Sequence, residues 1–172
     1  MCYFKTSFNP TGHNVSAEYW VAYDKENFYL AVKVDDPIHQ QRHNSNVWKD
    51  DSVQFVFAFG DTAPSILYHP APAPRTTFNY GTGLTPSGPI TEKYRGKDAG
   101  KKNLPINITR QGNTTFYEIC VPFAELGGKP DRFGFVIFDN NYPTKRHAPY
   151  WLEHSSGIAG GEDESKLKYL VY

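Results

Sequence analysis

The segment 52–59, with the sequence SVQFVFAF, alternates between two kinds of side chain, and this period constrains the fold most. Successive side chains of a β-strand point to opposite faces of its sheet. One face carries the bulky residues Val53, Phe55, Phe57 and Phe59, and the other carries Ser52, Gln54, Val56 and Ala58. The pattern predicts a strand whose bulky face lies in the core. The second face, small or polar, is suited to form the floor of a groove.

The same period of two recurs along most of the chain. It predicts strands at Ala17–Tyr23, Phe28–Asp35, Arg75–Tyr80, Leu104–Arg110, Thr115–Val121, Phe133–Asp139, Ala148–Leu152 and Leu167–Val171. Turn residues separate them, as at Asp24–Asn27 and Gln111–Asn113. The one helical turn expected is Pro122–Leu126, before a Gly-Gly pair. Many short strands with little helix predict an all-β fold, a two-sheet antiparallel β-sandwich.

Two segments are predicted to be loops. Asp61–Arg75 contains prolines at positions that exclude a central strand, and Gly81–Lys102 is rich in Gly, Pro, Thr and Lys. Strands are expected on both sides of each loop, so neither is interpreted as an interdomain linker. Residues 1–172 are therefore expected to form a single domain, which is a length that can bury a full core.

Charge and composition exclude several partners. Lys plus Arg and Asp plus Glu both number 18, so the chain lacks the basic surface that nucleic acid requires. No run of about 18 apolar residues is present, so no membrane-spanning segment is expected. Aromatic residues make up 16% of the chain. They suit packed strands and also a surface that stacks flat rings against a neutral ligand.

The start of the chain and its cysteines bear on localisation. Residues 1–4 lack the basic start and apolar stretch of a signal peptide, so either a signal has been removed or the chain is part of a longer protein, which we favour. The two cysteines, Cys2 and Cys120, are too few for a disulfide framework. Whether they pair depends on whether the N-terminus lies beside the strand of Cys120.

Several motifs occur in an order that resembles family 9 carbohydrate-binding modules. An aromatic-rich strand ends in Asp36-Pro37, a loop follows with Asn44-Ser45-Asn46-Val47-Trp48, and Asp51-Ser52-Val53-Gln54 opens the next strand. Weaker matches follow in family order, at Phe78–Gly83, Tyr117–Ile119, Phe133–Phe135 and Ser165-Lys166. The resemblance covers roughly residues 17–172. The usual N-terminal strand of the family has no counterpart in residues 1–16, where Met1–Asn14 is expected to provide a different edge.

The resemblance implies a jelly-roll-like sandwich without catalytic activity, usually appended to secreted xylanases and other polysaccharide-acting enzymes. Such modules hold a sugar, often a chain end, between two tryptophans, and structural calcium is also found in them. The implied partners are a polysaccharide or oligosaccharide and a covalently linked catalytic domain, and the implied location is extracellular. No organic cofactor is implied.

The resemblance also implies a set of sugar-binding residues. Trp48 matches the first clamp tryptophan, and Gln54 stands where the family has Glu, so the contact with a hydroxyl would be weakened or redirected. Thr77 occupies the place of a sugar-binding Arg, and Arg75, on the same strand face as Thr77 and Asn79, could substitute for it. Each of these residues also has a purely structural interpretation, as a plug, a strand residue or a solvated surface residue.

The second clamp tryptophan has no counterpart, because Gly161 takes its position. Another aromatic side chain would have to supply the missing wall, and the candidates are Trp20, Tyr68, Tyr142 and Trp151. Of these, Trp151 is interpreted as a strand or core residue rather than a ligand platform.

Acidic residues bracket the loop that precedes the strand at 52–59. Asp35 and Asp36 lie before it, and Asp50 and Asp51 after it. Calcium takes six to eight oxygen ligands, so Asp36 and Asp51 are predicted as ligands of a structural calcium ion. A solvated acidic loop is the alternative.

The sequence lacks the common catalytic motifs. No HExxH, GxSxG, P-loop or paired-cysteine zinc motif occurs, so the chain is not expected to be an enzyme. Two other functions stay open: a structural or interaction sandwich that has lost its sugar site, as Gly161 would suggest, and a haem-binding sandwich of a related group. The haem hypothesis is the weakest, because the histidines fall in expected loops and the only Met is the first residue.

Overall fold

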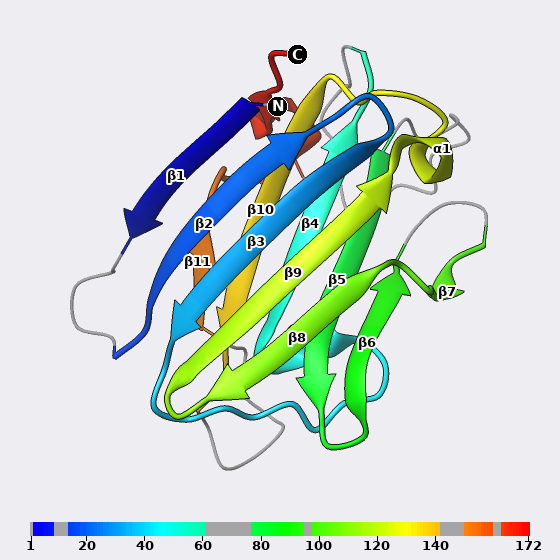
Figure 1. Ribbon diagram of the computed structural model, residues 1–172. Helices are drawn as coiled ribbons and strands as arrows, with labels where there is room; N and C mark the ends of the chain where they lie inside the picture. Colours follow the sequence, from blue (N-terminus) through cyan, green and yellow to red (C-terminus); the bar gives the residue numbers. More distant parts are fainter. Residues whose placement is uncertain (1, 9–13, 61–76, 95–97, 142–149, 160–162) are drawn as a thin grey trace.

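The computed structural model consists of two antiparallel β-sheets packed face to face (Figure 1). It describes all residues except 1, 9–13, 61–76, 95–97, 142–149 and 160–162. The smaller sheet, called sheet A, has the strand order β1-β2-β3-β9-β8. The larger, called sheet B, has the order β11-β10-β4-β5-β6-β7, with β12 paired to β10. The predicted two-sheet antiparallel sandwich is confirmed.

The central strands of sheet A alternate between core and solvent. Its strands are β1 (Cys2–Phe8), β2 (Ser16–Tyr23), β3 (Asn27–Asp35), β8 (Ile106–Gln111) and β9 (Thr114–Pro122). In β3 every second residue is buried, beginning with Phe28 and Leu30. This is the pattern of a sheet that has one face on the core and one toward solvent.

Sheet B is covered on both faces at its centre. Its strands are β4 (Ser52–Ala58), β5 (Thr77–Thr85), β6 (Gly88–Lys93), β7 (Gly100–Lys101), β10 (Arg132–Asp139), β11 (Tyr150–Glu153) and β12 (Lys168–Tyr169). Every residue of β4 and of β10 is buried. The short helical turns are η1 (Val47–Lys49), α1 (Phe123–Leu126) and η2 (Glu164–Lys166).

Aromatic rings from both sheets meet in the core. Phe28 of β3 contacts Phe57 of β4 edge-on, with ring centroids 5.0 Å apart, and also Phe133 of β10 at 4.6 Å. Burying one such ring contributes roughly 1.5–3 kcal/mol, so these contacts hold the sheets together. The side chains of Val53, Phe55 and Phe57 lie in this core, as their spacing predicts, and Phe59 packs against it.

The predicted loop at Gly81–Lys102 is wrong for most of its length. It contains the end of β5, a turn at Thr85–Gly88, all of β6 and the two residues of β7. The glycines that suggested a loop are needed in the strand for another reason. The Tyr94 hydroxyl and the Gln41 amide occupy the space where a side chain at Gly81 or Gly83 would lie.

The predicted N-terminal edge is confirmed as β1, which pairs with β2 from Cys2↔Tyr23 to Phe8↔Ala17. Cys120 is a free thiol on β9, and β2 and β3 separate its strand from β1. With strands about 4.8 Å apart, these cysteines are about 14 Å from each other, which is too far for a disulfide. Among the described residues, no helix has the length and apolarity needed to cross a membrane.

Candidate functional site

The outer face of sheet B carries the predicted sugar-binding residues, and part of that face is covered. Val56 and Ala58 lie in a second small apolar cluster with Val136, Phe138, Ile158 and Leu167. The expectation that the even-numbered residues of β4 form an open groove floor is therefore wrong for Val56 and Ala58. Ile158 and Leu167, from the segment after β11, pack on them because this face is apolar there.

Trp48 lies on a firmly held turn with its indole partly exposed, at 38%. The turn η1 follows Asn46, whose φ is 53°, and its first residue, Val47, is fully buried. The Val47 amide donates to Glu92 Oε2 at 3.2 Å, and the Asn140 side chain donates to the Lys49 carbonyl at 2.7 Å. The backbone is thus fixed on both sides of Trp48 while the ring is left accessible, so the interpretation of Trp48 as an internal plug is not supported.

Polar residues of β4 and β5 lie on the same outer face as Val56. The Gln54 amide donates to Asn79 Oδ1 at 2.9 Å, and both side chains are buried. Thr77 is also buried, at 4% exposure, next to Ala58 in the strand pairing. Arg75 lies outside the described residues. The structure therefore brings Gln54, Asn79 and Thr77 onto one face, as predicted, and binds the first two to each other.

The aromatic candidates for the second wall fall in different places. Gly161, Tyr68 and Tyr142 lie outside the described residues. Trp151 is on β11 directly opposite Phe138 of β10, on the outer face of sheet B, and is 41% exposed. Trp151 is a strand residue, one of the two places that the sequence interpretation allowed, and it lies outside the core because its neighbour Leu152 is the one that points inward.

Trp20 is on the outer face of sheet A, on the far side of the sandwich. It lines a depression of ≈ 630 Å³ together with Tyr29, Ala31, Glu118 and Cys120, among others. Strand pairing places Trp20, Ala31 and Glu118 in one row across β2, β3 and β9. This surface is separate from the one that carries Trp48.

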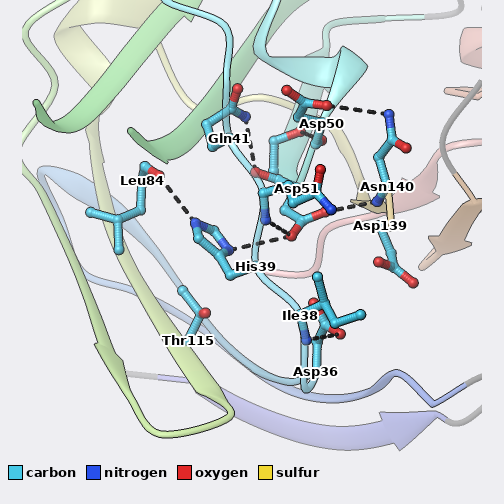
Figure 2. Close-up of polar contacts among 12 residues, drawn as sticks. Asp36, Ile38, His39, Gln41, Asp50, Asp51, Leu84, Thr115, Asp139 and Asn140 are labelled. Atoms are coloured by element: carbon cyan, nitrogen blue, oxygen red, sulfur yellow. Dashed lines mark hydrogen bonds and ion pairs between the residues drawn. The ribbon is translucent and has the colours of Figure 1, made fainter. Parts of the chain in front are cut away.

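Three buried carboxylates meet at one end of the sandwich, where β3 and β10 end and β4 begins (Figure 2). Asp36, Asp51 and Asp139 each have an oxygen within 4.8 Å of the others. Their exposures are 5%, 4% and 8%. The predicted pair of Asp36 and Asp51 is thus brought together, with Asp139 as an additional member.

Backbone amides orient two of these carboxylates. The Gln40 amide donates to Asp51 Oδ2 at 2.6 Å and the Asn140 amide to Asp51 Oδ1 at 2.7 Å, while the Ile38 amide donates to Asp36 Oδ1 at 3.0 Å. Asp139 Oδ1 has no hydrogen-bond partner among the described residues. An unpartnered buried carboxylate oxygen is costly unless a cation balances it.

Burial dominates the electrostatics of this cluster. Desolvation raises the pKa of Asp51 to about 7, with a smaller rise from the charges of Asp139 and Asp36. It also raises the pKa of Asp139 to about 6, and the charge of Asp36 adds to that. The pKa of Asp36 is raised for the same first reason. Ionising all three groups together therefore requires a compensating positive charge.

The donor set fits calcium. Oxygens bound to one Ca²⁺ at 2.3–2.6 Å lie no more than about 5 Å from each other, and these carboxylates meet that limit. Asp35 and Asp50 are used elsewhere: Asp35 pairs with Lys33 at 3.0 Å, and Asp50 with Arg42 at 2.6 Å. His39 lies beside the cluster, with Nε2 3.0 Å from the Leu84 carbonyl and Nδ1 3.4 Å from Asp51.

Comparison with known proteins gives the family. Residues 2–146 match the family model described as "Carbohydrate family 9 binding domain-like", and the chain belongs to that family. No curated protein matches the chain. Two solved structures of a carbohydrate binding module family 9 from Caldicellulosiruptor kristjanssonii have the same fold, one in complex with glucose and one with cellotriose. Their TM-scores are 0.66 and 0.65 at 12% and 13% identity; each alignment covers 95% of this chain and 78% or 76% of the other.

Proposed function

We propose that the protein is a non-catalytic module that binds a neutral saccharide on the outer face of sheet B, at Trp48. The observation that carries this proposal is the partly exposed indole of Trp48 on a turn whose backbone is fixed by hydrogen bonds. The indole lies on the face where the Gln54 amide donates a hydrogen bond to Asn79. A pyranose ring presents C–H groups that pack on an aromatic plane, and its hydroxyls find amide partners at the edge. The solved relatives with glucose and cellotriose support the class of ligand.

The surroundings of the site belong to the same proposal. Thr77 and Asn79 border the ligand, and Arg75, two residues before Thr77 in the sequence, is proposed as a further contact. The Asp36–Asp51–Asp139 cluster holds a structural calcium ion. That ion would neutralise the carboxylates and tie the end of β3 in sheet A to β4 and β10 in sheet B. The module acts in a secreted protein, linked to a catalytic domain that degrades polysaccharide.

Affinity electrophoresis tests the binding directly. Migration of the protein is compared in gels that contain xylan, cellulose derivatives, pectin or galactan, and in gels without polysaccharide. We expect retardation by at least one neutral polysaccharide, and its loss in Trp48→Ala. The loss of Trp48 should not unfold the protein, because the buried Val47 and not the exposed indole anchors the turn.

One observation favours a second function, that of a structural or interaction domain. Gln54, Thr77 and Asn79 are buried, and Ile158 and Leu167 cover the neighbouring part of the face. A sandwich that has closed its sugar site would have this appearance. If wild-type protein migrates equally in every gel, the structural function replaces the proposal.

A further inference from the structure

Two glycines on the outer face of β5 leave room for side chains from other parts of the chain. A side chain at Gly81 would overlap the phenol end of Tyr94, and one at Gly83 would meet the Gln41 amide. Tyr94 directly follows β6, and its backbone amide donates to the Asn79 carbonyl at 2.8 Å. The phenol end of Tyr94 therefore lies over Gly81, on the part of sheet B against which the turn η1 packs.

The backbone amides of this turn have partners that are known one by one. The Val47 amide donates to Glu92 Oε2 at 3.2 Å. The Lys49 and Asp50 amides donate to carbonyls of the same turn at 3.1 and 3.2 Å. The Trp48 amide is left, because the first amides of a helical turn have no partner inside it. Within the protein, its partner has to come from outside the turn.

The Tyr94 hydroxyl faces the Trp48 amide. It is buried, and among the described residues it makes no hydrogen bond of normal geometry. Burial raises the pKa of Tyr94 and the charge of Glu92 adds to the rise, whereas the nearby Trp48 amide lowers the pKa. A buried hydroxyl and the amide left over from the turn are thus placed to serve each other.

Gln41 holds the other side of the same peptide unit. Its Nε2 atom donates to the Val47 carbonyl at 3.0 Å. That carbonyl and the Trp48 amide belong to one planar unit, because the peptide bond between Val47 and Trp48 does not rotate. Gln41 over Gly83 and Tyr94 over Gly81 therefore contact the two edges of the peptide unit from which the Trp48 side chain extends.

We infer that Tyr94 is a positioning residue of the saccharide site, which together with Gln41 fixes the peptide unit before Trp48 and so sets the direction of the indole. The inference rests on the proposed function, since the direction of the indole matters for binding only if a sugar stacks on it. Gly81 has a part in the same arrangement, because any side chain there would displace the phenol end of Tyr94.

Tyr94→Phe tests the inference, because it keeps the ring and removes the hydroxyl. Amide hydrogen exchange and the ¹⁵N–¹H spectrum report on the turn in the free protein, and calorimetry with cellotriose reports on affinity. We expect the Trp48 amide to exchange at least about tenfold faster and the Trp48 indole signal to move. The affinity should fall about fivefold, because the indole is no longer held in one direction. Gly81→Ala should have the same three effects.

Tyr29→Phe is the matched control. It removes a hydroxyl from the outer face of sheet A, where Tyr29 donates to Asp24 Oδ2 at 2.8 Å. Exchange of the Trp48 amide and the affinity for cellotriose should stay within about twofold of wild type. In Tyr94→Phe the faster exchange should be confined to the turn η1, whereas a general loss of stability would speed exchange throughout β4 and β5.

The outcomes separate the inference from the proposed function. Unchanged exchange of the Trp48 amide in Tyr94→Phe and Gly81→Ala overturns the inference, as does faster exchange throughout β4 and β5. Faster exchange in the turn with an affinity within about twofold of wild type overturns it too, because the turn is then held for another reason. Wild-type protein that does not bind cellotriose overturns the proposed function, and the exchange rates and indole signal of the free protein then decide whether Tyr94 positions Trp48.

Discussion

Replacing Asp139 by Asn should make the protein more stable without calcium and less responsive to calcium. In the folded protein the pKa of Asp139 is raised to about 6, from 3.8. A folded-state pKa above the unfolded value means that ionisation disfavours folding. The cost therefore grows as the pH rises from 3.8 through 6 and is fully present above it. The difference of about two pKa units corresponds to about 3 kcal/mol.

The amide removes that charge but keeps the size of the side chain. Some of the gain is lost because Asn141 donates to Asp139 Oδ2 at 3.3 Å, a weak bond that an amide accepts less well. We expect Asp139→Asn to raise the free energy of unfolding in EDTA at pH 7.5 by about 2 kcal/mol. For a chain of this size that is about 4–8 °C in melting temperature.

Calcium should stabilise the wild type more than Asp139→Asn. Sites in extracellular modules bind Ca²⁺ with dissociation constants of about 10⁻⁴–10⁻³ M. At about 10 mM calcium, such a site stabilises the wild type by about 1.4–2.7 kcal/mol through mass action. Asp139→Asn, which lacks one carboxylate ligand, should gain much less.

Differential scanning calorimetry in EDTA, calcium and magnesium measures both effects. Asp35→Asn is the matched control, because Asp35 is next to Asp36 in the chain but pairs outward with Lys33. It should respond to calcium as the wild type does. A wild type whose melting temperature is the same in EDTA and calcium, or an Asp139→Asn variant that is less stable than wild type in EDTA, would refute the account of this cluster.

Three further predictions concern the fold. His154 is stacked on Phe135, and burial lowers its pKa to about 4, so protonation of His154 favours unfolding. The free energy of unfolding should therefore fall by up to about 3 kcal/mol as the pH is lowered from 6.5 to 4. Urea titrations of His154→Phe should lack that part of the pH dependence. Phe55→Ala should cost about 3–5 kcal/mol in urea denaturation, because Phe55 is fully buried; a loss below 1 kcal/mol would contradict its place in the core. Gly81→Ala should lower the melting temperature by several degrees because the new methyl meets the Tyr94 hydroxyl, and Tyr94→Phe in the same chain should restore part of it.

The period of two in the sequence was sufficient to predict the sandwich. In β4 and β10 the alternation of bulky residues separates the core face from the outer face, and the core contains Phe55, Phe57, Phe133 and Phe135. β6 was missed because its turn residues and its neighbouring glycines are typical of loops. Glycine is needed at these positions because the side chains of Tyr94 and Gln41 occupy the space that a Cβ atom would take. No local sequence pattern reveals these contacts.

The candidate site was predictable only where its residues lie close together in the chain. Trp48, Asp51 and Gln54 are within one short segment, and Asp36 directly follows the strand before it. Asp139 was missed and the face of Trp151 was left open, because both depend on long-range pairing. Asp139 reaches Asp51 only because β10 runs antiparallel to β4 with Phe138 opposite Ser52. Trp151 lies on β11, a strand of four residues, whose alternation is too short to assign its two faces.

The central claim is that a saccharide contacts the outer face of sheet B, and the indole N–H signals of the tryptophans report on it most directly. In a ¹⁵N–¹H correlation spectrum each tryptophan gives one indole signal, which the Trp→Phe variants at 20, 48 and 151 assign. On addition of cellotriose, we expect a saturable shift of the Trp48 signal and no shift of the Trp20 signal. A saturable shift of the Trp20 signal alone, or no shift of any signal at millimolar sugar, would contradict it.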